Sequence, residues 1–227
     1  MPTADNAWLE DFSKGLTDVA LLYDCRLVGG DTVRGPLVIT IQGHGIVNSR
    51  QAIKRGDANI GDLILMTGPI GSAAALKVRE NNFSMSSVAQ QYLEKCFYQP
   101  QPQIEIGKLL NGVATSTIDI SDGLISDLGH ICKASNVGVR VNLDKIPISP
   151  HITNELSHYD YLEWALYGGD DYHLCVTVPE DFIKIIGQNF MEKYDVSFIG
   201  EITTGSDIEV YKGKEIVKSK PKGFIHF

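Results

Sequence analysis

The stretch TSTIDISDGLISDL, residues 115–128, decides the fold. In its first part Thr117 and Asp119 alternate with Ile118 and Ile120, a pattern typical of a strand with one buried face. We expect Ser121 to cap a helix, because apolar residues recur at helical spacing directly after it. Strands and helices alternate along much of the remaining chain as well. The pattern therefore predicts an α/β or α+β fold.

The same stretch predicts a cluster of polar groups where the strand meets the helix. Asp119, Ser121 and Asp122 follow one another there, at a place where backbone N–H groups also converge. Two carboxylates and a hydroxyl can hold a divalent metal on a phosphate chain. Alternatively, Asp122 only complements the helix dipole and Ser121 only caps. The stretch alone leaves both interpretations open.

Composition excludes several classes of protein. The chain has 227 residues, 43% of them apolar, which is enough for one large domain or two small ones. A net charge of −8 argues against binding to nucleic acid. The start MPTADNAWLEDF lacks the features of a signal peptide, and no window reaches about 18 apolar residues, so we expect a cytoplasmic protein. The cysteines are scattered without a C-x-x-C pair, which predicts free thiols.

Periodicity divides the chain into two lobes. The first has a predicted helix over 8–23 and strands over 25–28 and 37–47, which is too little to close a core alone. We therefore expect it to pair with another chain or with a segment that is not present. The polar, Gly-rich segment 50–62 indicates a joint between the lobes. Helices and strands then alternate, with a single helix expected over 155–166 and strands over 63–66, 138–143, 172–178, 196–202 and 208–211.

The tripeptide Gly-Gly-Asp occurs twice, ending at Asp31 and at Asp170. Paired glycines permit positive φ and let the backbone approach a ligand closely, which presents the following carboxylate at a strand edge. A tight turn whose Asp bonds its own backbone is the simpler alternative. Two such tripeptides together with D-x-S-D favour the functional interpretation.

Several familiar motifs do not occur. The sequence has no P-loop, so Asp-bridged metal ions would have to neutralise the phosphates of any bound nucleotide. Arg55 is a cation that can assist, although a solvated surface arginine is the commoner case. No H-x-x-x-H, H-E-x-x-H or G-x-S-x-G occurs, which disfavours covalent catalysis and assigns the histidines structural or surface roles.

Six blocks in order resemble the thiamine-monophosphate kinase family of the aminoimidazole-ribonucleotide-synthetase-like superfamily. These blocks are LVGGDTVRGPLVITIQGHG, GDLILMTGPIGSAAAL, IDISDGLISDLGHICKAS, ALYGGDDYHLCVTVP, FIGEI and KGFIHF. The resemblance implies transfer of the ATP γ-phosphate to thiamine monophosphate, which gives thiamine diphosphate and ADP by direct in-line attack. It also implies a Mg²⁺ cofactor and a homodimer. Selenophosphate and purine synthetases of the same superfamily resemble the final blocks less closely.

The resemblance implies roles for individual residues and no covalent catalytic residue. Asp170 stands where the family has Glu in GGEDY, which shortens the reach by one methylene. The implied sets are magnesium ligands Asp31, Asp119 and Asp122; ATP contacts Gly30, Asp31, Arg55 and Ser121; and substrate contacts Asp170 and Phe224.

The family's GDDAAV-like and EGVHF-like segments have no counterpart in this sequence. We therefore expect residues 1–55 to be the remnant of an N-terminal ATP-binding domain and residues 56–227 to be a complete C-terminal α/β domain with a mixed sheet. The chain alone is expected to be weakly active or inactive. Two alternatives stay open. The first is a non-catalytic nucleotide-binding or interaction module that pairs through its open N-terminal strands, and the second is a stable fragment without a function of its own.

Overall fold

The computed structural model describes residues 1–3, 5–48, 52–78, 85–157 and 160–217. The chain divides into two compact units, residues 1–46 and residues 47–227, and each is described by itself. Among the described residues, the helices are too short or too polar to cross a membrane.

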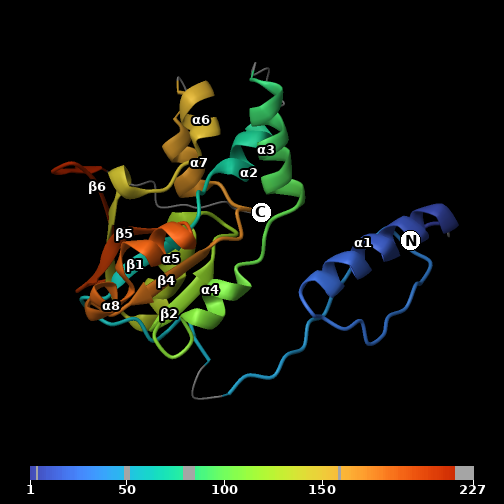
Figure 1. Ribbon diagram of the computed structural model, residues 1–227, viewed down its shortest axis with the longest axis horizontal. Helices are drawn as coiled ribbons and strands as arrows, with labels where there is room; N and C mark the ends of the chain where they lie inside the picture. Colours follow the sequence, from blue (N-terminus) through green and yellow to red (C-terminus); the bar gives the residue numbers. More distant parts are fainter. Residues whose placement is uncertain (4, 49–51, 79–84, 158–159, 218–227) are drawn as a thin grey trace. The chain divides into compact units, whose positions relative to one another are not determined.

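The first unit consists of helix α1 (Asn6–Leu22) and a following segment that forms neither helix nor strand (Figure 1). Asp5 caps the helix, because its side chain accepts a hydrogen bond from the Trp8 N–H at 3.2 Å. The rings of Trp8 and Phe12 stack with their centroids 5.3 Å apart. The predicted helix over 8–23 is confirmed, although none of its residues is buried.

The strands predicted over 25–28 and 37–47 are wrong. No strand forms among the described residues of the first unit, and apolar side chains such as Val28 and Ile46 are exposed. A strand is stable when a neighbouring strand satisfies its N–H and C=O groups. Alternation of apolar and polar residues indicates a preference for strand structure, but it does not show whether a neighbouring strand is present to pair with.

The second unit is built on a seven-stranded mixed sheet in the order β2-β4-β1-β5-β3-β6-β7. Neighbouring strands are antiparallel except for β3 and β6, which are parallel. This confirms the predicted α/β class with a mixed sheet. The strands are β1 (Leu63–Thr67), β2 (Ser116–Asp119), β3 (Gly138–Asn142), β4 (Leu174–Val178), β5 (Val196–Thr203), β6 (Ile208–Lys212) and β7 (Glu215–Val217).

Helices cover both faces of the sheet. In β1, Ile64 and Met66 belong to a core with helix α5 (Leu124–Ser135), whereas Leu65 packs in a second core with α4 (Ile104–Leu109). Helix α8 (Glu180–Lys193) lies on the side of this second core. A strand covered on both faces is largely apolar, which explains the run LILM, and the buried Thr67 at its end accepts a hydrogen bond from the Leu174 N–H.

A separate helical cluster packs beside the sheet (Figure 1). It comprises α2 (Ser72–Val78), α3 (Ser87–Tyr98), α6 (Pro150–Glu155) and α7 (Tyr161–Tyr167). The helix predicted over 155–166 is confirmed for 161–166, which lie in α7, but its first part is wrong, because a separate helix α6 ends at Glu155. Ser149 caps α6 by accepting the His151 N–H, and Asp160 caps α7 by accepting the Glu163 N–H at 3.2 Å.

Candidate functional site

The turn between β2 and α5, residues 120–123, is the centre of the candidate site. Ile118 and Ile120 are buried as predicted, while Asp119, Ser121 and Asp122 are half-buried. The prediction that Ser121 caps the helix is wrong. Helix α5 begins at Leu124, and its capping residue is Gly123, whose φ of 99° favours glycine.

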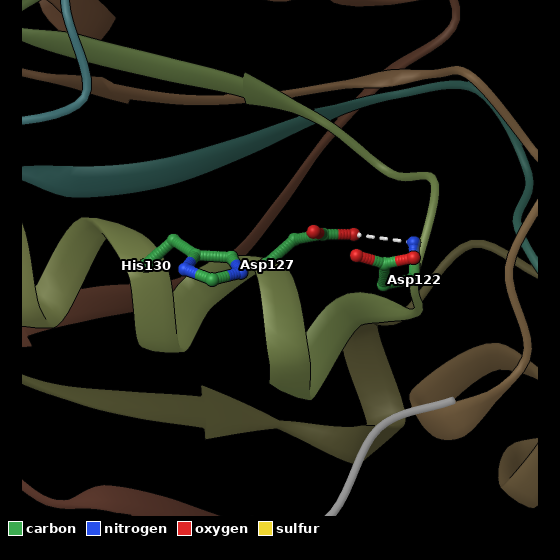
Figure 2. A group of neighbouring side chains, drawn as sticks. All are labelled: Asp122, Asp127 and His130. Atoms are coloured by element: carbon green, nitrogen blue, oxygen red, sulfur yellow. Dashed lines mark hydrogen bonds between the residues drawn. The ribbon is translucent and has the colours of Figure 1, made fainter. Parts of the chain in front are cut away.

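Asp127, in the first turn of α5, holds this turn. Its side chain is buried, and its Oδ2 accepts hydrogen bonds from the N–H groups of Ser121 and Asp122, each at 3.1 Å (Figure 2). Burial raises the pKa of Asp127, the two N–H groups lower it, and the charges of Asp122 and Asp119 raise it further. The carboxylates of Asp119 and Asp122 therefore lie near Asp127.

Sequence reasoning missed Asp127, although a signal was present. The buried stripe of α5 runs through Leu124, Leu128 and Ile131. Asp127 follows Leu124 by three residues and precedes Ile131 by four, so helical spacing places it on the same face. A carboxylate on the apolar face of a helix needs a partner, and the adjacent turn supplies two.

Asp122, Asp127 and His130 form a group whose potential ligand atoms lie within 4.8 Å of one another. Figure 2 shows the Asp127 carboxylate facing the Asp122 backbone nitrogen, with His130 farther along the helix. Carboxylate oxygens such as those of Asp119 and Asp122 suit Mg²⁺, whereas an imidazole suits softer metals. The carboxylates of Asp119 and Asp122 are thus of the ligand type that suits the magnesium implied by the resemblance, whereas the group of neighbouring ligand atoms joins Asp122 to Asp127 and His130.

The second Gly-Gly-Asp segment lies directly against this turn. The Asp170 N–H donates to the Ser121 carbonyl at 3.0 Å, and the Tyr172 N–H donates to the Ile120 carbonyl at 2.9 Å. A Cβ placed on Gly169 would lie 1.9 Å from the Ser121 carbonyl oxygen, so a glycine is needed here. The backbone of this segment therefore approaches the turn that carries Asp122, and its predicted approach to a ligand stays a prediction.

Asp170 is held by two side chains. Its carboxylate pairs with the Lys77 ammonium and accepts a hydrogen bond from the Tyr172 hydroxyl at 3.0 Å. Asp170 and Tyr172 have φ values of 65° and 55°, a conformation that costs free energy in residues other than glycine. Burial raises the pKa of Tyr172, and so do its hydrogen bond to Asp170 and the charges of Asp170, Asp119 and Asp122. This loop therefore also lies close to the two carboxylates of the turn.

The neighbouring Asp171 has a different environment. Its carboxylate accepts hydrogen bonds from the N–H groups of Gly71 at 2.8 Å and Ala73 at 3.4 Å, at the start of α2. Burial raises its pKa to about 6, although these N–H groups act in the opposite direction. Asp171 thus ties the loop to the helical cluster.

The remaining residues implied by the resemblance are Arg55, Gly30, Asp31 and Phe224. Arg55 is exposed, and its carbonyl accepts a hydrogen bond from the Ser135 hydroxyl at the last residue of α5. Twelve helical residues span about 18 Å, so this contact is far from the turn at the other end. Gly30 and Asp31 are exposed residues of the first unit, and Phe224 lies outside the described residues. The roles of these four residues stay predictions.

Known proteins match most of this chain. Residues 59–213 match the family "AIR synthase related protein, C-terminal domain". A thiamine-monophosphate kinase of Buchnera aphidicola subsp. Acyrthosiphon pisum is 38% identical over 233 residues, with 100% of this chain and 72% of the relative covered. The thiamine-monophosphate kinase of Escherichia coli K12 is 46% identical over 182 residues, which cover 79% of this chain and 56% of that protein.

Solved structures agree with these sequence relatives. The crystal structure of thiamine-monophosphate kinase from Stenotrophomonas maltophilia K279a superposes with a TM-score of 0.81 at 33% identity, covering 92% of this chain and 69% of that one. A structure described as AaThiL complexed with AMPPCP and TMP has a TM-score of 0.79 at 24% identity, covering 99% of this chain and 70% of that one, and supports the fold. By its sequence relatives and the matched domain, the chain belongs to the thiamine-monophosphate kinase family.

Proposed function

We propose that this protein transfers the γ-phosphate of ATP to thiamine monophosphate. An oxygen of the substrate's phosphate attacks the γ-phosphorus in line, the bond to the β,γ-bridging oxygen breaks, and the products are thiamine diphosphate and ADP. The observation that carries the proposal is the contact between two segments: the N–H groups of Asp170 and Tyr172 donate to the carbonyls in the turn that carries Asp122. The chain in which this contact occurs is related to thiamine-monophosphate kinases. No covalent intermediate is needed.

The carboxylates of Asp119 and Asp122 are proposed to hold Mg²⁺. The ion, when bound, neutralises charge that develops on the transferred phosphoryl group. Both side chains are half-buried, so they can reach a ligand at the surface while their backbone is fixed by the surrounding hydrogen bonds. Ser121 lies between them and is proposed to contact the nucleotide. Arg55, Gly30 and Asp31 are assigned to ATP or metal by the resemblance alone.

The Asp170 carboxylate is proposed to contact thiamine monophosphate. Lys77 and Tyr172 fix the position of this carboxylate. Such support is useful for an aspartate, whose side chain is one methylene shorter than the glutamate of the family. Phe224 is assigned to the same substrate by the resemblance. The homodimer and the cytoplasmic location also remain predictions from the sequence.

The test uses the purified 227-residue chain with ATP, Mg²⁺ and thiamine monophosphate. Formation of thiamine diphosphate is measured by chromatography, and binding of Mg²⁺ with the analogue AMPPCP is measured by titration calorimetry. Asp122→Asn should lower both turnover and nucleotide affinity by at least roughly 100-fold, because a metal ligand contributes several kcal/mol and each tenfold corresponds to about 1.4 kcal/mol. Asp207→Asn, at an exposed aspartate before β6, is the matched control.

The outcomes separate activity from binding. Turnover that Asp122→Asn abolishes supports the kinase function and contradicts the expectation that the chain alone is inactive. Binding of both thiamine monophosphate and Mg²⁺–AMPPCP without turnover supports the function together with that expectation. A folded chain that binds neither ligand would refute the proposal.

A further inference from the structure

Asp127 is a buried carboxylate with no role in the reaction assigned by the resemblance. Asp127 is 2% exposed, and it lies on the face of α5 that also carries Leu124, Leu128 and Ile131. Removing a carboxylate from water is costly unless hydrogen bonds compensate. The partners of Asp127 should therefore indicate what the fold gains from it.

These partners do not belong to the helix. A capping side chain satisfies amides within the first turn of its helix, which here begins at Leu124. Asp127 instead accepts the N–H groups of Ser121 and Asp122, which precede the helix. The contact therefore fixes the turn that precedes the helix.

The geometry fixes one peptide group in particular. Two consecutive N–H groups converge on a single oxygen, Asp127 Oδ2, at 3.1 Å each. From the opposite side the Asp170 N–H holds the Ser121 carbonyl at 3.0 Å. With the peptide between Ser121 and Asp122 held from both sides, the direction in which the Asp122 side chain leaves the backbone is also fixed.

We propose that Asp127 is a positioning residue that aims the Asp122 carboxylate at the metal-bound phosphates. The inference rests on the proposed function, since it assumes that Asp122 binds the metal. Side chains that orient metal ligands typically affect metal affinity by about 10- to 100-fold. In this proposal Asp127 Oδ2 is engaged by the two N–H groups, and the residue acts on Asp122 through the backbone of the turn.

The experiment compares Asp127→Ala and Asp127→Asn with variants of Asp62 in the full chain. Asp62 is also a buried carboxylate, and its Oδ2 accepts the Asn59 N–H at 2.8 Å and the Thr115 hydroxyl at 2.6 Å. Thr115 precedes β2, at the opposite end of that strand from Asp119. Asp62→Ala and Asp62→Asn thus report the cost of disturbing a buried carboxylate away from the turn.

Three quantities are measured for each variant: the dissociation constant of Mg²⁺–AMPPCP, the exchange rates of the Ser121 and Asp122 amide hydrogens, and the melting temperature. Asp127→Ala should weaken nucleotide binding by about 10- to 100-fold. Asp127→Asn should weaken it less, because the amide oxygen still accepts both N–H groups without a charge. Both variants should speed exchange of the two amides. The Asp62 variants should lower the melting temperature but leave nucleotide binding within about twofold of the wild type.

The inference is overturned if Asp127→Ala binds Mg²⁺–AMPPCP like the wild type, or if Asp62→Ala weakens binding equally. Absence of nucleotide binding by the wild type also overturns it. Thiamine diphosphate formation and binding of thiamine monophosphate are measured on the same variants in separate assays, with ATP in place of AMPPCP for turnover. Nucleotide binding that depends on Asp127, in a chain that neither binds thiamine monophosphate nor turns over, would count against the kinase function and leave the positioning role standing.

Discussion

The contact between Gly169 and the turn at residues 120–123 allows a sharp test of the candidate site. A Cβ added at Gly169 would lie 1.9 Å from the Ser121 carbonyl oxygen, 2.8 Å from its carbon and 3.2 Å from the Asp122 Cα. All three atoms belong to the backbone and cannot rotate away. Because ordinary contact begins near 3.4 Å, Gly169→Ala has to move the loop and the turn apart by about 1.5 Å.

The displacement should affect activity more than stability. Overpacking of this kind typically costs about 1–3 kcal/mol of folding free energy, and loss of the hydrogen bond from the Asp170 N–H to Ser121 adds about 1 kcal/mol. A misplacement of about 1 Å can lower a rate by about 100-fold. Since the turn carries Asp122, we expect kcat to fall by about that factor while the chain remains folded.

Denaturant unfolding and thiamine diphosphate formation are measured on Gly169→Ala beside a matched control. Gly129 lies inside α5, and a Cβ there would meet only the Ile208 Cδ1 at 3.7 Å. Gly129→Ala should stabilise the helix by up to about 1 kcal/mol without changing the rate. Gly169→Ala with wild-type stability and rate would show that the close approach is not required and would refute the reasoning.

Three further predictions concern other parts of the fold. The pKa of Asp171 is raised from 3.8 to about 6, so between these pH values the folded chain keeps a proton that the unfolded chain releases. The free energy of unfolding should therefore fall by up to about 3 kcal/mol as the pH rises from about 4 to about 6. Urea unfolding at several pH values measures this fall, which should be absent in the control variant Asp171→Asn. Lys77→Met should change the free energy of unfolding by less than about 1 kcal/mol in the same assay, because the Lys77 and Asp170 side chains are 45% and 33% exposed. Leu128→Ala should destabilise the chain by about 2–5 kcal/mol in denaturant titrations, since Leu128 is fully buried and its removal leaves a cavity.

Elements with local signals were predictable from the sequence. The apolar run of β1 and the alternation that ends at Asp119 gave the correct strands, because burial of one or both faces sets those patterns directly. The strands expected over 25–28 and 37–47 failed, because pairing depends on residues distant in sequence. The first part of the helix expected over 155–166 failed because the caps Ser149 and Asp160 were not recognised.

The candidate site was predictable to a similar extent. Asp119, Ser121 and Asp122 are neighbours in sequence, so any strand followed by a helix brings them together. Their contact with the second Gly-Gly-Asp segment depends on β2 pairing with β4, where Asp119 lies opposite Leu174. The ion pair between Lys77 and Asp170 depends on how α2 packs. The sequence around Lys77 and the sequence around Asp170 do not reveal that packing.

Electrostatics explain why the turn needs such extensive backbone support. Burial is the largest cause of the raised pKa values of Asp127 and Tyr172, which flank the turn. The negative charges of Asp119 and Asp122 raise both pKa values further. Negative charge is therefore concentrated at one place, and mutual repulsion would spread the carboxylates if the backbone could move. Hydrogen bonds from the turn to Asp127 and from the Asp170 loop resist that movement. The turn is thereby held in place, and binding of the proposed Mg²⁺ and phosphates there would require less free energy for rearrangement.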